Sequence, residues 1–381
     1  MLAMKRIILA FDSFKGSLSS KEAADAFEEG LLSVMPEAEI HKITIADGGE
    51  GTMEALVEML GGRIIDIYVC DPIGRKTKAC YAIIDEGKTA IIEMAQTSGL
   101  TLLNDEERNP LLTSTYGTGQ MIADALDRGC RKIMLGIGGS ATNDGGTGMM
   151  EALGYRFTDS NGNPLKGCGK NLERICSIDS SKVHPAVAEA EWLVACDVNN
   201  PLYGPNGAAY VFAAQKGADR KMIEQLDQGL RNYAKAIMKF NGTDVQAIAG
   251  SGAAGGMGAA LTALLHAWLS SGIGMVLDAI GFDIAICGAS LVVTGEGKID
   301  WQTLMGKAPG GILQRAAAQG IPTIAVGGTV EWCDELRSCG FAKIIELNKQ
   351  GLPLDMAMHH DTAWENMRNA AKELLLTDDI L

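Results

Sequence analysis

Three glycine-rich turns in the sequence run into segments with helical periodicity. ADGGEGTMEAL (46–56) and NDGGTGMMEAL (143–153) share one pattern, and AAGGMGAAL (253–261) keeps the glycines without the acid. The first N–H groups of a helix lack partners inside it, and glycine leaves them uncovered, so such a turn can bind an anion. The alternative is that the glycines only permit tight turns or close packing. The phosphate-binding hypothesis names Gly48, Gly49, Gly51, Gly139, Ser140, Asn143, Gly145 and Gly146.

Carboxylates stand in or beside these turns and at the ends of apolar runs. GEGKID (295–300) directly follows the run ASLVV. A carboxylate at the end of a parallel strand can hold Mg²⁺ or accept a proton from a hydroxyl nucleophile, whereas a solvated loop acid is the alternative for each one. The candidates are Asp47, Glu50, Asp144, Glu296 and Asp300.

Further polar side chains follow other apolar runs. FDSFKG (11–16) places Asp12 and Lys15 after the first run, and ACDVNN (195–200) places Asp197 after WLVAC. A lysine in such a position can pair with a phosphoryl group or with a substrate carboxylate. The other basic candidates are Arg75, Lys216 and Lys298.

The elements that must position these residues alternate between short apolar strands and helices at both ends of the chain. We expect strands over 5–11, 39–46, 289–295, 321–328 and 342–347, with helices over 19–35, 52–60, 306–319 and 331–338. Ser19 or Ser20 is the expected N-cap of the first helix. This alternation predicts a parallel sheet with crossover helices.

The middle of the chain follows a different pattern. Residues 62–95 contain three strand-like runs separated by the turns DPIGRK and DEGK, with no helix-length segment between them. That arrangement predicts antiparallel strands, which are foreign to a doubly wound sheet. We therefore expect a discontinuous parallel α/β domain, residues 1–63 and 288–381, interrupted by a mixed α/β domain, residues 64–287. At 381 residues and about 150 residues per domain, two domains are reasonable.

Composition excludes several classes of protein. The formal net charge is −14, which argues against a nucleic-acid-binding surface and against adhesion to a membrane surface. Nine cysteines without metal-binding spacing are typical of reduced thiols in a cytoplasmic protein. The stretch 245–277 carries no formal charge, but small residues and His266 interrupt it, so we expect a buried helix there and no membrane span.

Common catalytic motifs are absent, and one weak competitor is present. The sequence has no GxxxxGK[ST], HExxH or GxSxG. MLGIGGSA (134–141) fits the dinucleotide-binding pattern G-x-G-x-x-A, with Asp159 further on, but TNDGGTG intervenes where a helix should begin. A nicotinamide-dependent dehydrogenase therefore stays as an alternative, beside a nucleotide or metabolite sensor without catalysis.

The motifs together resemble the bacterial glycerate kinase family, which includes the glycerate 2-kinases. The resemblance runs from about residue 5 to about residue 375. It rests on DSFKGSLSSKEAADA, ADGGEGT, DPIGR, IEMAQTSGL, TSTYGTGQ, GIGGSATNDGGTGM, DVNNPLYGPNGAA, GAAGGMGAAL and TGEGKIDWQTLMGKAPGG. Phe11 and the pair Ala213–Ala214 depart from the family pattern, but neither departure removes a polar side chain.

This resemblance implies transfer of the ATP γ-phosphoryl group to D-glycerate, with Mg²⁺, giving 2-phosphoglycerate; 3-phosphoglycerate is the alternative product. It implies a Rossmann-like or flavodoxin-like domain interrupted by a mixed one, with the active site in the cleft between the two. Only small-molecule partners are expected, and a homo-oligomer stays open. Asp197 is the first candidate for the base and Asp300 the second, with Lys15 also catalytic. Asp47, Asp144, Glu296 and Asp300 are the candidate Mg²⁺ ligands, and Asp12, Arg75, Lys216 and Lys298 are candidate substrate contacts.

Overall fold

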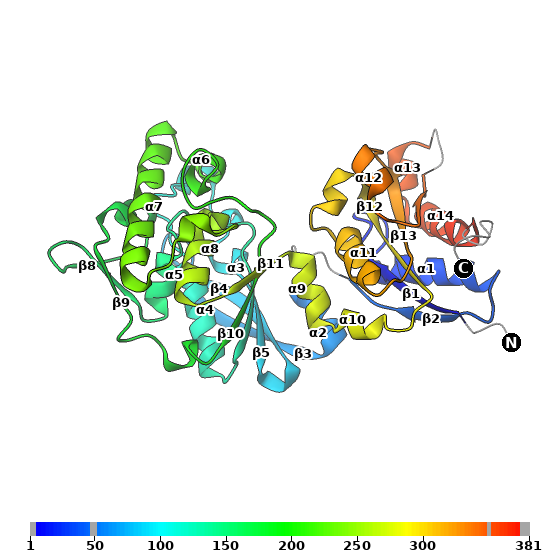
Figure 1. Cartoon of the computed structure of the whole chain (residues 1–381), viewed down its shortest axis with the longest axis horizontal. Coiled ribbons are helices and arrows are strands. Elements are labelled where there is room, and N and C mark those ends of the chain that lie inside the picture. Colours follow the sequence, from blue (N-terminus) through cyan, green and yellow to red (C-terminus); the bar gives the residue numbers. More distant parts are fainter. Residues whose placement is uncertain (1–4, 46–51, 349–351, 374–381) are drawn as a thin grey trace. The chain divides into compact units, whose positions relative to one another are not determined.

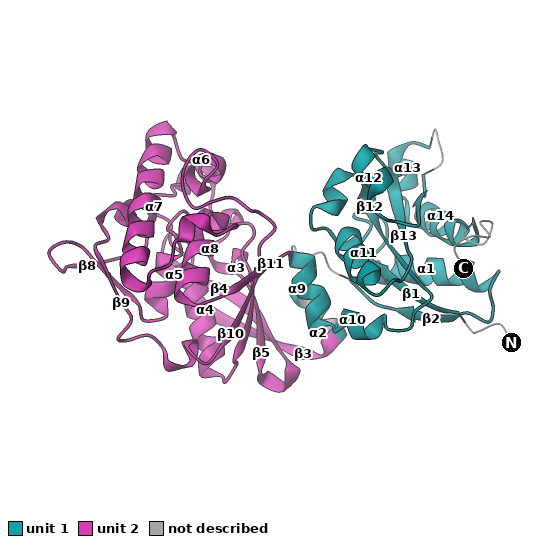
Figure 2. Cartoon of the chain, in the orientation of Figure 1, with its two compact units in different colours: residues 1–59, 272–381 teal, residues 60–271 magenta. Residues whose placement is uncertain are grey.

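The structure is a computed structural model and describes residues 5–45, 52–348 and 352–373. The chain divides into two compact units, residues 1–59 with 272–381 (unit 1) and residues 60–271 (unit 2), shown in Figure 2. Unit 2 is thus an insertion into unit 1. The sequence placed the two boundaries at 63/64 and 287/288. The later one moves because Ile273, Leu277 and Phe282 pack into the core of unit 1.

Unit 1 is built on a parallel sheet of five strands in the order β14-β13-β12-β1-β2 (Figure 1). The strands are β1 (Arg6–Phe11), β2 (Glu39–Lys42), β12 (Leu291–Ile299), β13 (Thr323–Val330) and β14 (Lys343–Glu346). The helices are α1 (Ser20–Leu32), α2 (Thr52–Leu60, which crosses the boundary), α9 (Gly272–Ala279), α10 (Phe282–Ala285), α11 (Ala308–Ala318), α12 (Asp334–Ser338), α13 (Leu354–Ala357) and α14 (His360–Glu373). All five strands and the helices expected between them are present.

Both faces of this sheet are buried, as β1 illustrates. Ile7, Leu9 and Phe11 pack with α1 and α14, whereas Ile8 and Ala10 pack with α9, α10 and α11. Successive side chains of a strand point to opposite faces, so an unbroken apolar run is needed where helices cover both. Helix α1 begins as expected: the Ser19 hydroxyl accepts from the Glu22 amide, and the Glu22 carboxylate accepts from the Ser19 amide, a capping box.

Unit 2 is built on a mixed sheet of six strands in the order β11-β10-β6-β5-β4-β3. The strands are β3 (Gly62–Cys70), β4 (Lys76–Ile84), β5 (Thr89–Glu93), β6 (Lys132–Gly136), β10 (Glu191–Ala195) and β11 (Trp268–Ser270). The pairs β3–β4 and β4–β5 are antiparallel, as the short turns predicted, and the other pairs are parallel. Because a parallel pair needs a crossover, longer segments containing helices precede β6, β10 and β11.

The rest of unit 2 consists of a small antiparallel sheet and helices around one core. The small sheet has the order β8-β7-β9, from β7 (Arg156–Thr158), β8 (Pro164–Leu165) and β9 (Ser177–Asp179). The helices are α3 (Ala95–Ser98), α4 (Tyr116–Asp127), α5 (Thr147–Ala152), α6 (Ala208–Phe212), α7 (Arg220–Asn241) and α8 (Ala253–Leu264). The long amphipathic α7 buries Leu226, Leu230 and Tyr233 in the core.

The uncharged stretch of the sequence contains α8, whose residues are almost all buried in the core of unit 2. The expectation of a buried helix is confirmed. Among the described residues, no helix combines the length and apolarity needed to cross a membrane.

Candidate functional site

In unit 1 the acidic candidates meet where the sheet reverses its order. From β1 the chain adds β2 on one side, and it later adds β12, β13 and β14 on the other. Ligands of open α/β sheets bind at such a switch point, beyond the carboxyl ends of the strands. Asp12 follows β1 directly, its amide donates to the carbonyl of Gly295 in β12 (2.9 Å), and Glu296 is the next residue. Asp12 and Glu296 are 7% and 8% exposed.

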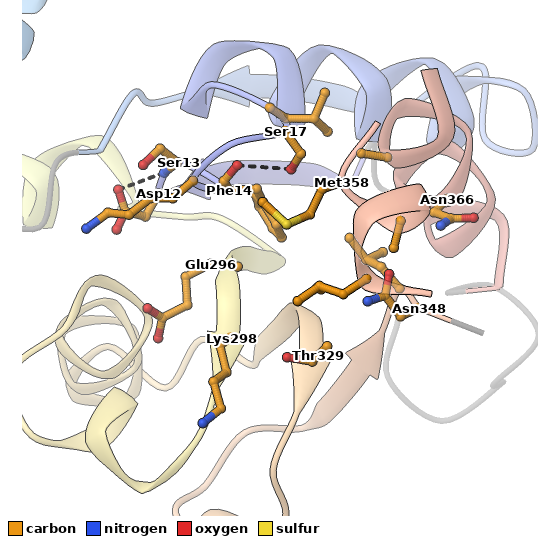
Figure 3. A pocket seen from close by; sticks show the side chains of 18 of the residues that line it. Asp12, Ser13, Phe14, Ser17, Glu296, Lys298, Thr329, Asn348, Met358 and Asn366 are labelled. Carbon is orange, nitrogen blue, oxygen red and sulfur yellow. Dashed lines mark hydrogen bonds between the residues drawn. The ribbon is translucent and has the colours of Figure 1, made fainter. Parts of the chain in front are cut away.

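A cavity of about 390 Å³ opens at this point (Figure 3). Its lining includes the charged side chains of Asp12, Lys15, Glu296, Lys298 and Lys307. The volume lies within the range of small-molecule sites. The cavity of unit 1 therefore joins two sequence-predicted regions, 11–16 and 295–300, with the start of α11.

Lysines and carboxylates alternate on the polar side of this cavity. Thr303 donates from Oγ1 to Glu296 Oε1 at 2.7 Å, and Lys307 Nζ lies 3.4 Å from Glu296 Oε2. The same Nζ is 3.9 Å from Asp300 Oδ1. Lys298 Nζ lies 3.2 Å from Asp300 Oδ2 and 2.6 Å from Glu331 Oε2. Lys298 and Lys307 therefore both line the cavity, and both lie close to carboxylates.

The pKa values of Glu296 and Asp300, two of the three acids in this network, are shifted in opposite directions. Burial raises the pKa of Glu296, against the opposing hydrogen bond from Thr303 and the charge of Lys307. Burial also acts to raise the pKa of Asp300, but the hydrogen bond from Lys298 and the charge of Lys307 outweigh it, so the pKa is lowered. The hydrogen bond to Glu331, followed by that to Asp300, raises the pKa of Lys298. Asp300 is therefore the more firmly ionised of the two acids.

One of the cavities in unit 2, called the unit 2 cavity below, has a volume of about 360 Å³ and lies beside the ends of β6 and β10. Gly138, Gly139 and Ser140 line it from the loop after β6, and Asp197 lines it from the loop after β10. Gly138 and Gly139 are exposed, and a Cβ on Gly138 would meet no atom within 4 Å. These two positions are open to an approaching ligand, as the hypothesis for Gly139 requires.

Lys216 is one of the residues that line the unit 2 cavity. It is 2% exposed, and its Nζ donates to Ser140 Oγ and to the Thr142 carbonyl, both at 2.7 Å. Burial lowers the pKa of Lys216 to about 7, although the charge of Asp144 opposes that shift. The Lys216 ammonium can attract an anionic ligand. Its hydrogen bonds to Ser140 and Thr142 also stabilise the 138–142 loop.

Gly145 and Gly146 of the NDGGTG turn do not have the exposed amides that the predicted phosphate-binding site requires. Gly145 and Gly146 are buried, and an added Cβ would lie 2.9 Å from the Tyr233 ring and from Ala260, respectively. Their amides are already used: Gly145 donates to the Gly255 carbonyl, and Gly146 donates to Asp144 Oδ1. These glycines allow close packing, which was the alternative interpretation.

Asp144 organises this turn. It is fully buried, and its Oδ2 accepts from the amide and the hydroxyl of Thr115, both at 2.8 Å, and from the Gly148 amide at 3.2 Å. With Oδ1 engaged by Gly146, the carboxylate has a full set of protein donors. These contacts give Asp144 a structural role, and its predicted role as a metal ligand stays a prediction. Asn143 is also fully buried and does not line the unit 2 cavity.

The first turn of α8 contains three consecutive left-handed residues, Ala254, Gly255 and Gly256, with φ of 50°, 68° and 90°. A left-handed alanine is strained, and such residues gather at functional sites. Ala254 lines the cavity of unit 2, whereas the two glycines are buried. The third glycine-rich turn therefore shapes one wall of that cavity.

Arg75 is occupied by acids. Its guanidinium pairs with Asp71 and with Glu107, the latter at 2.6 Å, and it lines neither of the cavities above. The positive charge of Arg75 is therefore already paired, and the structure does not bring Arg75 to the candidate site. Asp47, Gly48, Gly49, Glu50 and Gly51 lie outside the described residues.

Lys307 and Thr303 were missed in the sequence. Both lie in the run DWQTLMGKAPGG, and Lys307 immediately precedes α11, with Pro309 in the first turn. A lysine at a helix start is a weak signal on its own. Only the fold shows that this helix begins beside Glu296.

A magnesium ion would find suitable donors in unit 1. In the described part of the chain, no group of three or more His, Cys, Asp or Glu residues could hold a metal. Mg²⁺, however, commonly takes one or two carboxylates and completes its coordination with waters and substrate phosphates. Glu296 and Asp300, both largely buried beside the cavity, fit that requirement.

Comparisons with known proteins show which family the chain belongs to. The model of the glycerate kinase family matches residues 7–377. A glycerate kinase of Bacillus subtilis is 43% identical over 370 residues, covering 97% of this chain and 96% of its own. The glycerate 2-kinase of Escherichia coli K12 is 46% identical over 325 residues, or 85% of each chain. A crystal structure assigned to glycerate kinase 2 of Salmonella typhimurium LT2 matches with a TM-score of 0.85 and 43% identity over 98% of both chains. The chain belongs to the glycerate kinase family.

Proposed function

We propose that this protein is a glycerate 2-kinase, which transfers the γ-phosphoryl group of ATP to the 2-hydroxyl of D-glycerate. The observation that carries the proposal is the family match along nearly the whole chain, from residue 7 to residue 377. The cavity at the switch point of unit 1 supports it, because its cations suit polyphosphate and its acids suit a metal. The nine cysteines are free, which fits a reaction in the cytoplasm.

In this proposal the unit 1 cavity takes the nucleotide. Phosphoryl transfer needs positioning and charge neutralisation more than covalent chemistry. Lys15, Lys298 and Lys307 would neutralise phosphate oxygens, and Asp12 would orient the group that Lys15 binds. Glu296 and Asp300 would hold Mg²⁺, which supplies Lewis-acid stabilisation of the phosphate charge when bound.

The unit 2 cavity then takes glycerate. The amides of the exposed residues Gly138 and Gly139 and the buried cation of Lys216 would bind the carboxylate. Asp197 would accept the proton from the attacking hydroxyl, as a carboxylate at hydrogen-bond distance can. Asp300 stays the second candidate for this base, because its lowered pKa keeps it ionised.

A coupled ATP-consumption assay with D-glycerate tests the activity. The expected result is glycerate-dependent ADP formation that EDTA abolishes. The absence of turnover with D-glycerate, at saturating ATP and Mg²⁺, would refute the proposed function and favour a binding protein.

The position of the phosphate is tested in the same reaction. Phosphorus NMR distinguishes 2-phosphoglycerate from 3-phosphoglycerate. The proposal expects the 2-isomer as the first product in the absence of mutases. Initial formation of the 3-isomer would correct the regiochemistry and leave the kinase assignment intact.

A further inference from the structure

The unit 1 cavity has two chemically different sides. Asp12, Glu296 and Lys298 lie on one side in Figure 3, and Met358, Asn348 and Asn366 lie on the other. The lining of the cavity also contains apolar side chains: Phe14, Leu18, Leu347, Leu354, Met358 and Ala363. Of these, Met358 lies on the second side in Figure 3. Phosphate groups need only the charged side, so they leave the apolar side without an occupant.

A buried polar group lies on the apolar side without a partner. The amide nitrogen of Asn366, on α14, is buried and has no hydrogen-bond partner among the described residues. Buried donors are nearly always paired, because an unpaired one loses its hydration without compensation. Asn366 is one of the residues that line the cavity, so a ligand acceptor atom that reaches its amide nitrogen would complete the hydrogen bonding of that nitrogen.

The loop after β1, which carries Asp12 and Lys15, closes the apolar side of the cavity. Gly16 has a φ of +82°, and a Cβ there would lie 2.6 Å from Cε of Met358. Glycine thus lets the loop after β1 approach the α13–α14 connection closely. The result is a wall of flexible apolar side chains beside Asn366, which suits a flat ring.

We infer that this side of the unit 1 cavity is a subsite for the purine base of the nucleotide, with Asn366 as the donor to a ring nitrogen. The inference rests on the proposed use of ATP and adds where its base is bound. An adenine ring is flat and apolar on its faces and carries acceptor nitrogens at its edge. Its phosphates would then extend toward Lys15, Lys298 and Lys307. Asn348, two residues after the end of β14, lies within the same lining and can hydrogen-bond to a second position on the edge of the ring.

The test compares two probes on the full-length protein by titration calorimetry in magnesium buffer. ADP carries the base and ribose, whereas pyrophosphate carries only the charged end. If the subsite exists, wild-type protein binds ADP more tightly than pyrophosphate. In Asn366→Leu, ADP binding weakens about three- to tenfold, the effect of one hydrogen bond, and pyrophosphate binding stays within twofold. Met358→Ala, which removes part of the apolar wall, gives the same pattern.

Asn369→Leu is the matched control. Asn369 stands on the same helix, three residues further on, and does not line the cavity. Its ADP affinity should match that of the wild type. Thermal melts of Asn366→Leu check the fold; because the amide is unpartnered, its Tm should not fall.

Several outcomes overturn the inference. They are equal affinity of the wild type for ADP and pyrophosphate, unchanged ADP affinity in Asn366→Leu, and equal weakening of both probes in that variant. Binding needs neither glycerate nor turnover, so the two proposals fail separately. Normal ADP binding without kinase activity would refute the proposed function alone. An active Asn366→Leu enzyme with an unchanged KM for ATP would refute the subsite alone.

Discussion

The two cavities use positive charge in opposite ways. In unit 1, Lys298 and Lys307 reach the cavity from half-exposed positions and are balanced by Glu296, Asp300 and Glu331. In unit 2, Lys216 is buried and is held by two uncharged oxygens, of Ser140 and Thr142. A solvated, paired lysine keeps its charge over a wide pH range, whereas a buried one holds its proton weakly.

Because of this difference, substitutions of these lysines should affect ligand binding and protein stability differently in the two units. Exposed ion pairs contribute little to folding, so a change in the lysines of unit 1 should affect ligands more than the fold. Lys216 is part of the packed interior, so changing it should affect both. The predictions below follow this contrast from the largest expected effect to the smallest.

Asp197→Asn should give the largest effect. If Asp197 is the base, kcat falls about 10²–10⁴-fold, because a general base contributes that much. Asp197 is exposed, so Tm should stay near that of the wild type. Steady-state kinetics and a thermal melt measure both quantities, with Asn199→Ala, an exposed neighbour outside the cavity lining, as control. A loss of kcat below about tenfold would remove Asp197 from this role and leave Asp300.

Lys15→Ala should come next. Loss of a charge-assisted hydrogen bond to phosphate should lower kcat/KM for ATP about ten- to a hundredfold, with little change in Tm. Lys15 is exposed and makes no ion pair with a described residue. Lys21→Ala, an exposed lysine on α1, controls for the change in net charge. An unchanged kcat/KM in Lys15→Ala would mean that the 12–17 loop only shapes the cavity.

Lys216 should make activity and stability depend on pH in opposite directions. Above about pH 7 the folded protein loses the Lys216 proton, so kcat/KM for glycerate should fall, about tenfold by pH 8. The unfolded chain keeps that proton up to its ordinary pKa of 10.5, so it binds more protons than the folded chain between pH 7 and 10.5. The Lys216 contribution to the free energy of unfolding should therefore rise with pH in this window, by at most about 1.4 kcal/mol per unit.

Lys216→Met is the variant that checks this. Both pH dependences should flatten in it, as measured by initial rates and by urea unfolding at several pH values. Lys239→Met, near the end of α7, serves as control because Lys239 is exposed. A wild-type profile for kcat/KM that stays level from pH 6.5 to 8.5 would contradict the assigned role of Lys216.

Arg75→Gln should have the smallest effect. Its charge is already used by Asp71 and Glu107, so kcat/KM for both substrates should change less than about twofold. The free energy of unfolding should fall by about 1–2 kcal/mol, because the buried Asp71 carboxylate loses its ion pair but keeps the amides of Ile73 and residue 75 as donors. A tenfold rise in KM for glycerate would restore Arg75 to the substrate site predicted from the sequence.

The sequence predicted much of the fold because local patterns determine it. Apolar runs such as 321–328 became β13, and the short turns between 62 and 95 became antiparallel connections. The small sheet β8-β7-β9 and the long helix α7 were not predicted. The boundary near 272 was also missed, because α9 belongs to unit 1 through side chains such as Ile273 that pack with distant strands.

The candidate site was predicted only in part, since burial depends on residues far apart in the chain. Gly139 and Gly146 stand in one motif, yet Gly139 is exposed, whereas Gly146 packs on Met257 and Ala260. No local pattern distinguishes the two. The same holds for Lys216, whose partner Ser140 is 76 residues away.

The position of unit 2 as an insertion has a consequence for how the chain folds. Strand β1 lies between β2 and β12 in its sheet, and Ile7 pairs with Leu291 of β12. During synthesis, β1 and α1 must therefore wait for about three quarters of the chain before their sheet can close, whereas residues 60–271 are complete earlier. Domains generally fold as units, with those completed first folding first. We expect unit 2 to fold first and to bring the two ends of unit 1 close together, which reduces the entropic cost of joining strands that are 284 positions apart.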